Sequence, residues 1–442
     1  MKHYFKPAAI AYACFATALT FAPQVFAVQT FTVNTTLDQP DADPNDHVCQ
    51  TSTGTCSLRA AIMQGNYVTS TDVTIVVPAG TYTLTTPSNF FGGDDLSELD
   101  LTSPASGSPA ITIVGAGAST TIIDGNGDNR VFSVGFARTA TIRDVTIRNG
   151  SWLWGAGIEN GGALTLDHVS VSGNANASVG GGIDNSGNLM IRSSSVVGNS
   201  ASSGGGIYNR ASGSLIAVAS TVASNSADNG GGLYNEDGGV MLTVNSTIAG
   251  NHAITSGGGV ASYGSGGSGT FYNSTIVYNN ADRDNHFAGS GGGVAFLGSG
   301  NTLHLRNSLL AGNYLGTRAV YSDCDGTGTL EMSNNSFSLI GSSPGTTGAC
   351  TVYGNFGSHD FLNSVDFLGA LQDNGGPTQT VALLSGSNAI DATNPVSGCL
   401  DQNSQTIRTD QRGFPRNVGA RCDVGAFEYG AIDEIIFDNG FD

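Results

Sequence analysis

The chain has 442 residues, of which 64 are glycine, 39% are hydrophobic and 12% are charged. Its formal net charge is −19, and its only lysines are Lys2 and Lys6. A strongly acidic chain is not expected to bind nucleic acid or an anionic membrane surface, because both are polyanions. The lack of lysine after residue 6 excludes catalysis through a lysine Schiff base.

Residues 1–27 have the pattern of a secretory signal peptide. A basic start containing Lys2 and Lys6 precedes an apolar run, Ile10–Phe21, and the segment ends on a small residue, Ala27. The run is too short for a membrane span, and no later segment reaches 18 uninterrupted apolar residues. We therefore expect a mature chain without a transmembrane span and with a formal charge of −21, from 14 arginines and 35 carboxylates.

Residues 28–100 are predicted to form an N-terminal cap and the first coils of a repeat fold. Ser57–Met63 reads as a short amphipathic helix with Ser57 at its N-cap, and its apolar side could cover the end of the first coil. Apolar alternation over Val73–Val77 and Tyr82–Leu84 predicts the first strands. Such a cap is needed because an open strand edge promotes aggregation.

Two aspartate-rich loops allow a calcium site. Asp41, Asp43 and Asp46 precede the first mature cysteine, and oxygen ligands alternate with glycine between Asp124 and Asp128. Neither loop has the glutamate and spacing of an EF-hand. Asp-Gly and Asn-Gly are also ordinary turn sequences, so a turn is the preferred interpretation and calcium is the only cofactor considered.

Residues 101–345 carry an internal repeat of about 25 residues. A glycine cluster followed by an aliphatic residue recurs with steps of 25, 24, 26, 27 and 34 residues, the aliphatic positions being Ile158, Ile183, Ile207, Leu233, Val260 and Val294. An alternating apolar run ends in asparagine in the same phase, at Asn149, Asn174, Asn199, Asn225, Asn251, Asn279 and Asn313. Alternation indicates strands, and a unit this short must stack on its neighbours to bury its apolar side.

The repeat predicts an all-β fold, a right-handed single-stranded parallel β-helix of the pectin-lyase-like type. Glycine would occupy corners where a side chain clashes, and asparagines stacked in register would form an amide ladder. Leucine-rich repeats lack support because the leucine consensus is absent. A propeller requires repeats near 40 residues, and a calcium-binding β-roll requires a nine-residue period.

Two features interrupt the repeat and are candidate ligand sites. The coil between Val260 and Val294 is the longest, and its insertion contains Asp282, Asp284 and His286. Insertions in solenoids form loops on one face, often a binding face, although a tolerated surface loop is the simpler interpretation. The other candidates, Trp152 and Trp154, precede the first glycine cluster, where they could stack on sugar rings or fill the edge of a coil.

The regular period fades after about residue 340, which divides the C-terminal part into a module, 346–430, and an acidic tail, 431–442. Six cysteines remain after the signal peptide, and they allow 15 pairings. Proximity favours three local disulfides, namely Cys49–Cys56, Cys324–Cys350 and Cys399–Cys422. Such bridges require an oxidising compartment, which agrees with export.

Several motifs resemble known families. Cys56–Ile62 resembles the CSLREA signature of exported bacterial proteins, although Ala60 stands where that family has an acidic residue, so the reciprocal capping box is missing. The Gly-Gly-Gly-Ile repeats are similar to those of polymorphic outer-membrane proteins. Four C-terminal segments resemble the choice-of-anchor Q domain: Leu371–Thr378, Ala389–Ala392, Asp410–Gly413 and Asp423–Glu428. The resemblance implies a β-helix secreted by a bacterium or held on its outer surface.

We therefore expect a monomeric protein with a structural, adhesive or carbohydrate-binding role, without catalysis, whose partners are extracellular or cell-surface glycans or proteins. The alternative is a polysaccharide lyase or glycoside hydrolase that uses carboxylates on one face. The paired aspartates, Gly-His-Gly and Arg-x-Lys of polygalacturonase-like enzymes are absent. A carboxylate pair about 5–10 Å apart in a groove beside an arginine would favour the enzyme.

Overall fold

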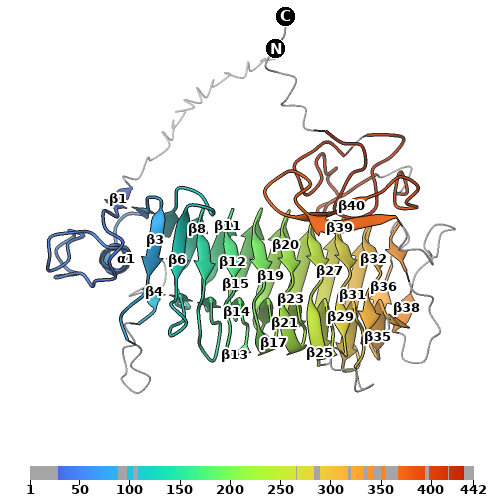
Figure 1. Ribbon diagram of the computed structural model, residues 1–442, viewed down its shortest axis with the longest axis horizontal. Coiled ribbons are helices and arrows are strands. Elements are labelled where there is room, and N and C mark those ends of the chain that lie inside the picture. The colour runs from blue at the N-terminus through green and yellow to red at the C-terminus, as the bar shows by residue number, and fades with distance from the viewer. Residues whose placement is uncertain are drawn as a thin grey trace, which may run out of the picture.

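The computed structural model is a long solenoid with a helix at its N-terminal end and a smaller module on one side (Figure 1). It describes residues 28–432 except 88–96, 103–107, 265, 283–288, 317–319, 333–336, 342–349, 354–366, 394–397 and 417. The predicted signal peptide, most of the acidic tail, and Asp284 and His286 of the insertion lie outside the described residues.

Each coil contributes short strands to parallel sheets that run the length of the solenoid, and we number the sheets in the order in which a coil visits them. Sheet 1 contains, in order, β1 (Gln29–Thr32), β2 (Val73–Val76), β5 (Ile111–Val114), β8 (Thr139–Arg143), β11 (Ala163–Asp167), β15 (Asn188–Arg192), β19 (Ser214–Val218), β23 (Val240–Val244), β27 (Ser268–Tyr272), β31 (Thr302–Arg306), β36 (Thr329–Glu331) and β38 (Thr351–Tyr353). Sheet 2 contains β3 (Gly80–Thr83), β6 (Thr121–Asp124), β9 (Thr146–Arg148), β12 (Ser170–Ser172), β16 (Ser195–Val197), β20 (Thr221–Ala223), β24 (Thr247–Ala249), β28 (Thr275–Val277), β32 (Leu309–Ala311) and β37 (Leu339–Ile340).

The remaining two sheets complete the coil. Sheet 3 contains β13 (Ala177–Val179), β17 (Ala201–Ser203), β21 (Ser226–Asn229), β25 (His252–Ser256), β29 (Asn280–Ala281), β33 (Tyr314–Leu315) and the antiparallel β34 (Val320–Tyr321). Sheet 4 contains β4 (Leu99–Leu101), β7 (Phe132–Val134), β10 (Ile158–Asn160), β14 (Ile183–Asn185), β18 (Ile207–Asn209), β22 (Leu233–Asn235), β26 (Val260–Tyr263), β30 (Val294–Leu297) and β35 (Cys324–Gly326). The predicted parallel β-helix is confirmed, and its stack begins well before the first glycine cluster.

Alternation along each strand builds the core. In sheet 1, Leu164 pairs with Leu189, which pairs with Leu215, and all three are almost completely buried. Because successive side chains in a strand point to opposite sides, the same register turns every second residue outward. The core is therefore a set of aliphatic columns parallel to the solenoid axis.

Asparagine side chains at two corners form the predicted amide ladders. Between sheets 4 and 1, each Nδ2 donates to the next Oδ1 at 2.7 Å, through Asn160, Asn185, Asn209 and Asn235. Between sheets 2 and 3, the corresponding distances are 2.8–3.0 Å, through Asn174, Asn199, Asn225, Asn251, Asn279 and Asn313. The second ladder ends on a carboxylate, because Asn313 donates to Asp323 Oδ1 at 2.8 Å.

The ladder position predicted for Asn149 is wrong by one residue. The strand register pairs Arg148 with Ser172, which places Gly150, and not Asn149, level with Asn174. Asn149 instead has a positive φ of 54° and donates to the Asp124 carboxylate. The Asn-Gly order of this coil is reversed in the next coils, so spacing alone misassigned its first asparagine.

Glycine occupies the corner between sheets 3 and 4 because no side chain fits there. Gly180 has a φ of 64°, and a Cβ on Gly181 would lie 2.5 Å from the carbonyl oxygen of Gly205 in the next coil. Contact between successive backbones at this corner requires both glycines.

The predicted capping helix is confirmed as α1 (Leu58–Tyr67), which is longer than the sequence indicated. Ser57 is the N-cap, and its Oγ accepts a hydrogen bond from the Ala60 N–H at 3.0 Å. No acidic residue lies in the first turn, as the missing capping box predicts. Arg59 is buried and pairs with Asp38 at 2.6 Å, which fastens the helix to the segment before it.

The C-terminal module packs against the outer side of sheet 2 near the far end of the solenoid (Figure 1). It contains one antiparallel hairpin, β39 (Leu368–Gln372) and β40 (Thr380–Leu383). Val381, Leu383 and Phe427 pack on the small outward residues Ala249 and Ala311 of sheet 2. Gln411 binds the solenoid directly, because its Nε2 donates to Thr221 Oγ1 at 2.8 Å and its Oε1 accepts from Thr247 Oγ1 at 2.6 Å.

The three disulfides favoured by proximity are present: Cys49–Cys56, Cys324–Cys350 and Cys399–Cys422. Across the part of the chain that the structure describes, no helix is long and apolar enough to cross a membrane.

Two of the segments that resemble the choice-of-anchor Q domain meet in the centre of the module. Arg412 pairs with Asp410 at 2.7 Å and lies 3.7 Å above the ring of Phe427. Glu428 is buried beside Arg416 and accepts a hydrogen bond from the Asp423 N–H. Burial raises the pKa of Glu428 to about 8 and the pKa of Asp423 to about 6.

Replacing Asn225 with alanine should lower the free energy of unfolding by about 2–3 kcal/mol, because buried donors and acceptors of Asn199, Asn251 and Val196 lose their partner. Urea denaturation followed by circular dichroism measures the change. Asn188→Ala, at an exposed position, is the control and should have little effect. Equal stability of the two variants would contradict a stabilising role for the ladder.

A protonated Glu428 stabilises the folded state, because its pKa is higher in the folded protein than in the unfolded chain. The stabilisation that the protonated Glu428 provides is fully present at about pH 4, and it is lost as the pH rises through about 8. We expect the urea midpoint to fall between about pH 5 and about pH 9, and to fall less in Glu428→Gln, which cannot ionise. Glu331→Gln, at a half-exposed glutamate, is the control. An unchanged pH dependence in Glu428→Gln would contradict the assignment.

Candidate functional site

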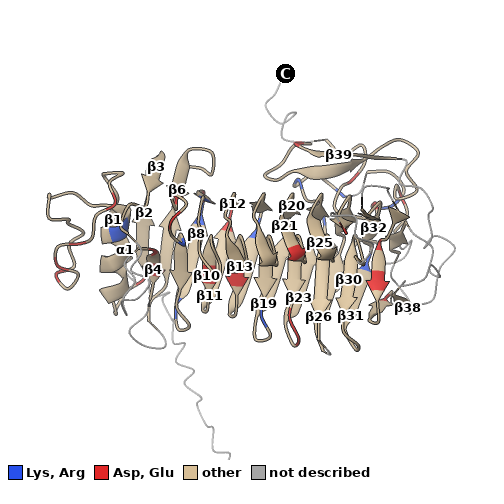
Figure 2. Ribbon diagram, turned by 60° about the horizontal axis from the view of Figure 1, so that its bottom comes forward, with Lys and Arg blue, Asp and Glu red and all other residues tan. Residues whose placement is uncertain are grey.

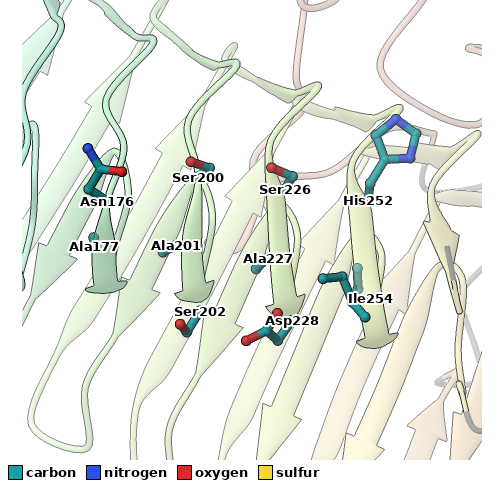
Figure 3. A pocket seen from close by; sticks show the side chains of 11 residues that line it. Asn176, Ala177, Ser200, Ala201, Ser202, Ser226, Ala227, Asp228, His252 and Ile254 are labelled. Carbon is teal, nitrogen blue, oxygen red and sulfur yellow. The ribbon is translucent and has the colours of Figure 1, made fainter. Parts of the chain in front are cut away.

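The outer side of sheet 3 carries a shallow groove that runs along the solenoid axis (Figure 3). It has a volume of about 290 Å³ and is lined by Asn176, Ala177, Ser200, Ala201, Ser202, Ser226, Ala227, Asp228, His252, Ala253 and Ile254. The residues come from the equivalent segment of four successive coils, so the groove presents the same repeat positions at each step.

Two rows of side chains line this groove. One row lies at the start of the strands and consists of Asn176, Ser200, Ser226 and His252; the other lies two residues later in the last three strands and consists of Ser202, Asp228 and Ile254 (Figure 3). Residues two apart in a strand point to the same side, which brings both rows to the groove. The residue between the two rows is alanine in all four coils, so only a small side chain stands at that position. The groove therefore presents hydrogen-bonding groups about 4.8 Å apart along the axis.

The predicted tryptophans lie at the N-terminal end of sheet 3. Trp154 forms a parallel bridge with Val179 of β13, and half of its surface is exposed. A second hollow of about 380 Å³ shares Asn176 with the groove and extends it to Ser151, next to Trp152. An exposed indole thus stands beside the coil where the polar rows begin.

The predicted insertion follows the fifth strand of the same sheet. Asp282 follows β29 directly, is 5% exposed and has a positive φ of 56°. Asp284 and His286 were named with it but lie outside the described residues. The structure therefore places Trp154 beside the first strand of sheet 3 and Asp282 after the fifth, with β33 and β34 beyond it.

Sequence reasoning missed a cluster of charged residues on sheet 4, next to the tryptophans. Arg130 Nη1 lies 2.8 Å from Glu98 Oε2 and 2.7 Å from Glu159 Oε2, so these two oxygens are at most about 5.5 Å apart. The guanidinium lies 5.7 Å from the Trp152 ring centre, and its Nε donates to the Trp154 carbonyl at 3.1 Å. Arg130 therefore holds both the carboxylates and the tryptophan segment in place.

Burial sets the protonation of this cluster. It raises the pKa of Glu98, and the neighbouring carboxylates Asp100 and Glu159 raise it further, while Arg130 opposes them. Glu98 and Asp100 share a hydrogen bond, so the proton is held between two carboxyl groups. The cluster thus contains a carboxylic acid beside an ion pair.

The outward row of sheet 4 continues from this cluster into stacked aromatic rings. Asp184, level with Glu159, pairs with Arg210 at 2.7 Å, and Tyr208 and Tyr234 follow in the next two coils. The two tyrosine rings stack at 4.8 Å with an angle of 7° between their planes. The sequence carried a signal for this row, because each of its residues directly follows the aliphatic residue of the glycine motif.

The aspartates considered for calcium bind protein groups. Gln64 Nε2 donates to Asp41 Oδ1, to the Asp43 carbonyl and to Asp46 Oδ1, at 2.8–3.2 Å. Asp124 pairs with Arg148 at 2.8 Å, and Asp128 lies in the adjoining turn. Within the described ranges, no three His, Cys, Asp or Glu side chains are grouped as metal ligands. These loops accordingly show the hydrogen bonding of turns.

The chain was compared with known proteins. No family model and no curated protein matches it. Among solved structures it is similar to the crystal structure of pectate lyase Pel9A, with a TM-score of 0.45 and 15% identity over 91% of this chain and 97% of that chain.

Replacing Arg130 with methionine should lower the free energy of unfolding by about 1–3 kcal/mol, because Glu98, Glu159 and the Trp154 carbonyl would lose a hydrogen-bond donor. Urea denaturation at neutral pH measures the loss. Arg192→Met, at an exposed arginine of sheet 1, is the matched control and should change little. Similar stability of the two variants would show that Arg130 is not a structural support.

Proposed function

We propose that the protein binds an extended polysaccharide along the groove of sheet 3, with Trp154 as a stacking platform at one end. The observation that carries this proposal is a groove lined by polar side chains at repeated positions, which begins one coil after a half-exposed indole. A sugar offers apolar ring faces and many hydroxyl groups. Binding sites for such ligands combine aromatic surface with a few well-placed hydrogen-bonding groups.

The shape and charge of the groove favour a neutral chain. The groove is long and shallow and is lined mainly by serine, alanine and asparagine, with Asp228 as its one carboxylate among the described lining residues. Few charged residues lie on the ribbon of these coils (Figure 2). In the adjoining cluster, Arg130 pairs with Glu159 and Arg210 pairs with Asp184, so no unpaired arginine is left there to attract a polyuronate.

We further propose that this binding takes place outside the bacterial cell. Three disulfides agree with an oxidising compartment. The pattern of residues 1–27 and the resemblance to CSLREA and choice-of-anchor Q proteins support secretion or display on the surface. The described contacts of the C-terminal module with the solenoid involve sheet 2 and its corners with sheets 1 and 3, and none of the residues that line the groove is among them, which leaves the groove accessible.

A second candidate function is cleavage of the bound polysaccharide. Glu98 and Glu159 are close enough for the carboxylate pair of a retaining glycosidase, and the pKa of Glu98 is raised as a general acid requires. Their shared contact with Arg130 favours the non-catalytic interpretation, because one nitrogen of Arg130, Nη1, occupies both carboxyl groups at once. An assay for new reducing ends and for unsaturated products, with Glu159→Gln as comparison, distinguishes the two functions.

Trp154→Ala should weaken binding to a polysaccharide found on a glycan array by about tenfold, because an exposed aromatic platform is lost while the fold is retained. Isothermal titration calorimetry measures the change. Phe136→Ala removes an aromatic that is 93% exposed and lies in the turn after β7, so it is the control. Equal loss in both variants, or no loss in Trp154→Ala, would contradict the proposal.

Ser202→Trp should block the groove and abolish binding without changing the thermal midpoint, because Ser202 is exposed and its side chain lines the groove. Ser212→Trp, at an exposed turn after β18, carries the same change elsewhere and should bind as the unmodified protein does. Full binding by Ser202→Trp would place the ligand on another surface.

A further inference from the structure

The C-terminal module contains a cavity of about 400 Å³ that is separate from the groove of sheet 3. Its walls are the disulfide Cys399–Cys422 and two loops, Thr406–Arg408 and Gly419–Arg421, together with Arg416. Three arginines thus line one cavity in a mature chain that has only 14 arginines against 35 carboxylates. Such a local excess of positive charge is opposite to the charge of the protein as a whole.

Arg416 forms the buried end of this arginine set. It is 2% exposed; its Nη2 donates to Asn245 Oδ1 at 2.8 Å, and its Nη1 donates to the Asp423 carbonyl at 3.2 Å. The nearest carboxylate oxygen is Glu428 Oε2, at 3.8 Å. Among the described residues, nothing accepts a hydrogen bond from the buried Nε. A buried guanidinium nitrogen without an acceptor is costly, so Arg416 adds an incompletely satisfied positive charge to the inner wall of the cavity.

The other two arginines lie nearer the surface. Arg408 is exposed, and Arg421 is half-buried with one hydrogen bond, from Nη1 to the Thr393 carbonyl at 3.3 Å. The neighbouring carboxylate, Asp391, accepts from the backbone N–H groups of Ala420 and Arg421 at 2.7 and 2.8 Å, which fixes it in the loop. Arg408 and Arg421 therefore line the cavity, and no carboxylate is among its described lining residues.

We propose that this cavity binds the carboxylate group of a small acidic ligand of monosaccharide size, such as a uronic acid. The planar guanidinium fork matches a carboxylate, and the volume falls within the usual range for small-molecule sites. Ile407, Ala420 and the disulfide provide apolar wall for the body of the ligand. The cavity is separate from the groove of sheet 3, so failure of the polysaccharide proposal would leave this proposal intact, and the reverse also holds.

The test is calorimetric titration of the mature protein with sodium glucuronate, and with glucose as the neutral analogue, at matched ionic strength. Glucuronate should bind at least about tenfold more tightly than glucose, since the carboxylate makes charge-assisted hydrogen bonds. Equal affinity for the two sugars, no binding of glucuronate, or equally tight binding of inorganic sulfate would overturn the assignment.

Variants locate the binding. Arg421→Gln and Arg408→Gln should each weaken glucuronate binding by about fivefold to tenfold, while Arg192→Gln, which removes one exposed positive charge from sheet 1, should not. Arg408 is exposed, so its replacement leaves the packing intact and decides the question if Arg421→Gln fails to fold. Unchanged affinity in Arg408→Gln would overturn the proposed site.

Discussion

Each corner residue of this solenoid must match the residue one coil away, because the backbones of successive coils touch there. At the corner between sheets 3 and 4 the contact is so close that only glycine fits, with Gly181 against the carbonyl of Gly205. At the two corners on either side of it, asparagine amides bond to one another at 2.7–3.0 Å. A one-residue slip would break both sets of contacts, so they set the register of every strand.

The same register creates the functional surfaces. Once the coils are aligned, residues at the same repeat position form a row along the solenoid. Substitutions at that position from coil to coil decide whether the row is polar, charged or aromatic. On sheet 3 the row of Ser200, Ser226 and His252 forms a polar groove, whereas on sheet 4 the row changes from Glu159 and Asp184 to Tyr208. The C-terminal module covers sheet 2, where outward alanines allow it to pack closely. The surfaces available for function are therefore the rows that no other part of the chain covers.

The sequence predicted those parts of the fold that repeat or that are local. Coil length, strands, ladders, the helix after Ser57 and the three disulfides all depend on spacing within one or two coils. The error at Asn149 arose where the Asn-Gly order reverses. The Glu98–Arg130–Glu159 cluster was missed because its residues precede or begin the regular repeat. The docking of Gln411 on Thr221 was unpredictable because it joins residues 190 positions apart without any period.

Of the candidate site residues, Trp152 and Trp154 were named as aromatics before the first glycine cluster, and Asp282 was named from the insertion. The structure places Trp154 beside β13 and Asp282 after β29 of sheet 3. The groove between them had no sequence signal of its own, because serine and alanine are common in any surface strand. Only the stacking of coils shows that Ser200, Ser226 and His252 are neighbours.

The most direct test of the account is the dependence of affinity on oligosaccharide length. Titration of the mature protein with a series of oligomers from a bound polysaccharide should show affinity rising with each added sugar and then levelling off when the groove from Trp154 to Ile254 is filled. Affinity that is the same for a monosaccharide and for longer oligomers would contradict binding along the solenoid axis.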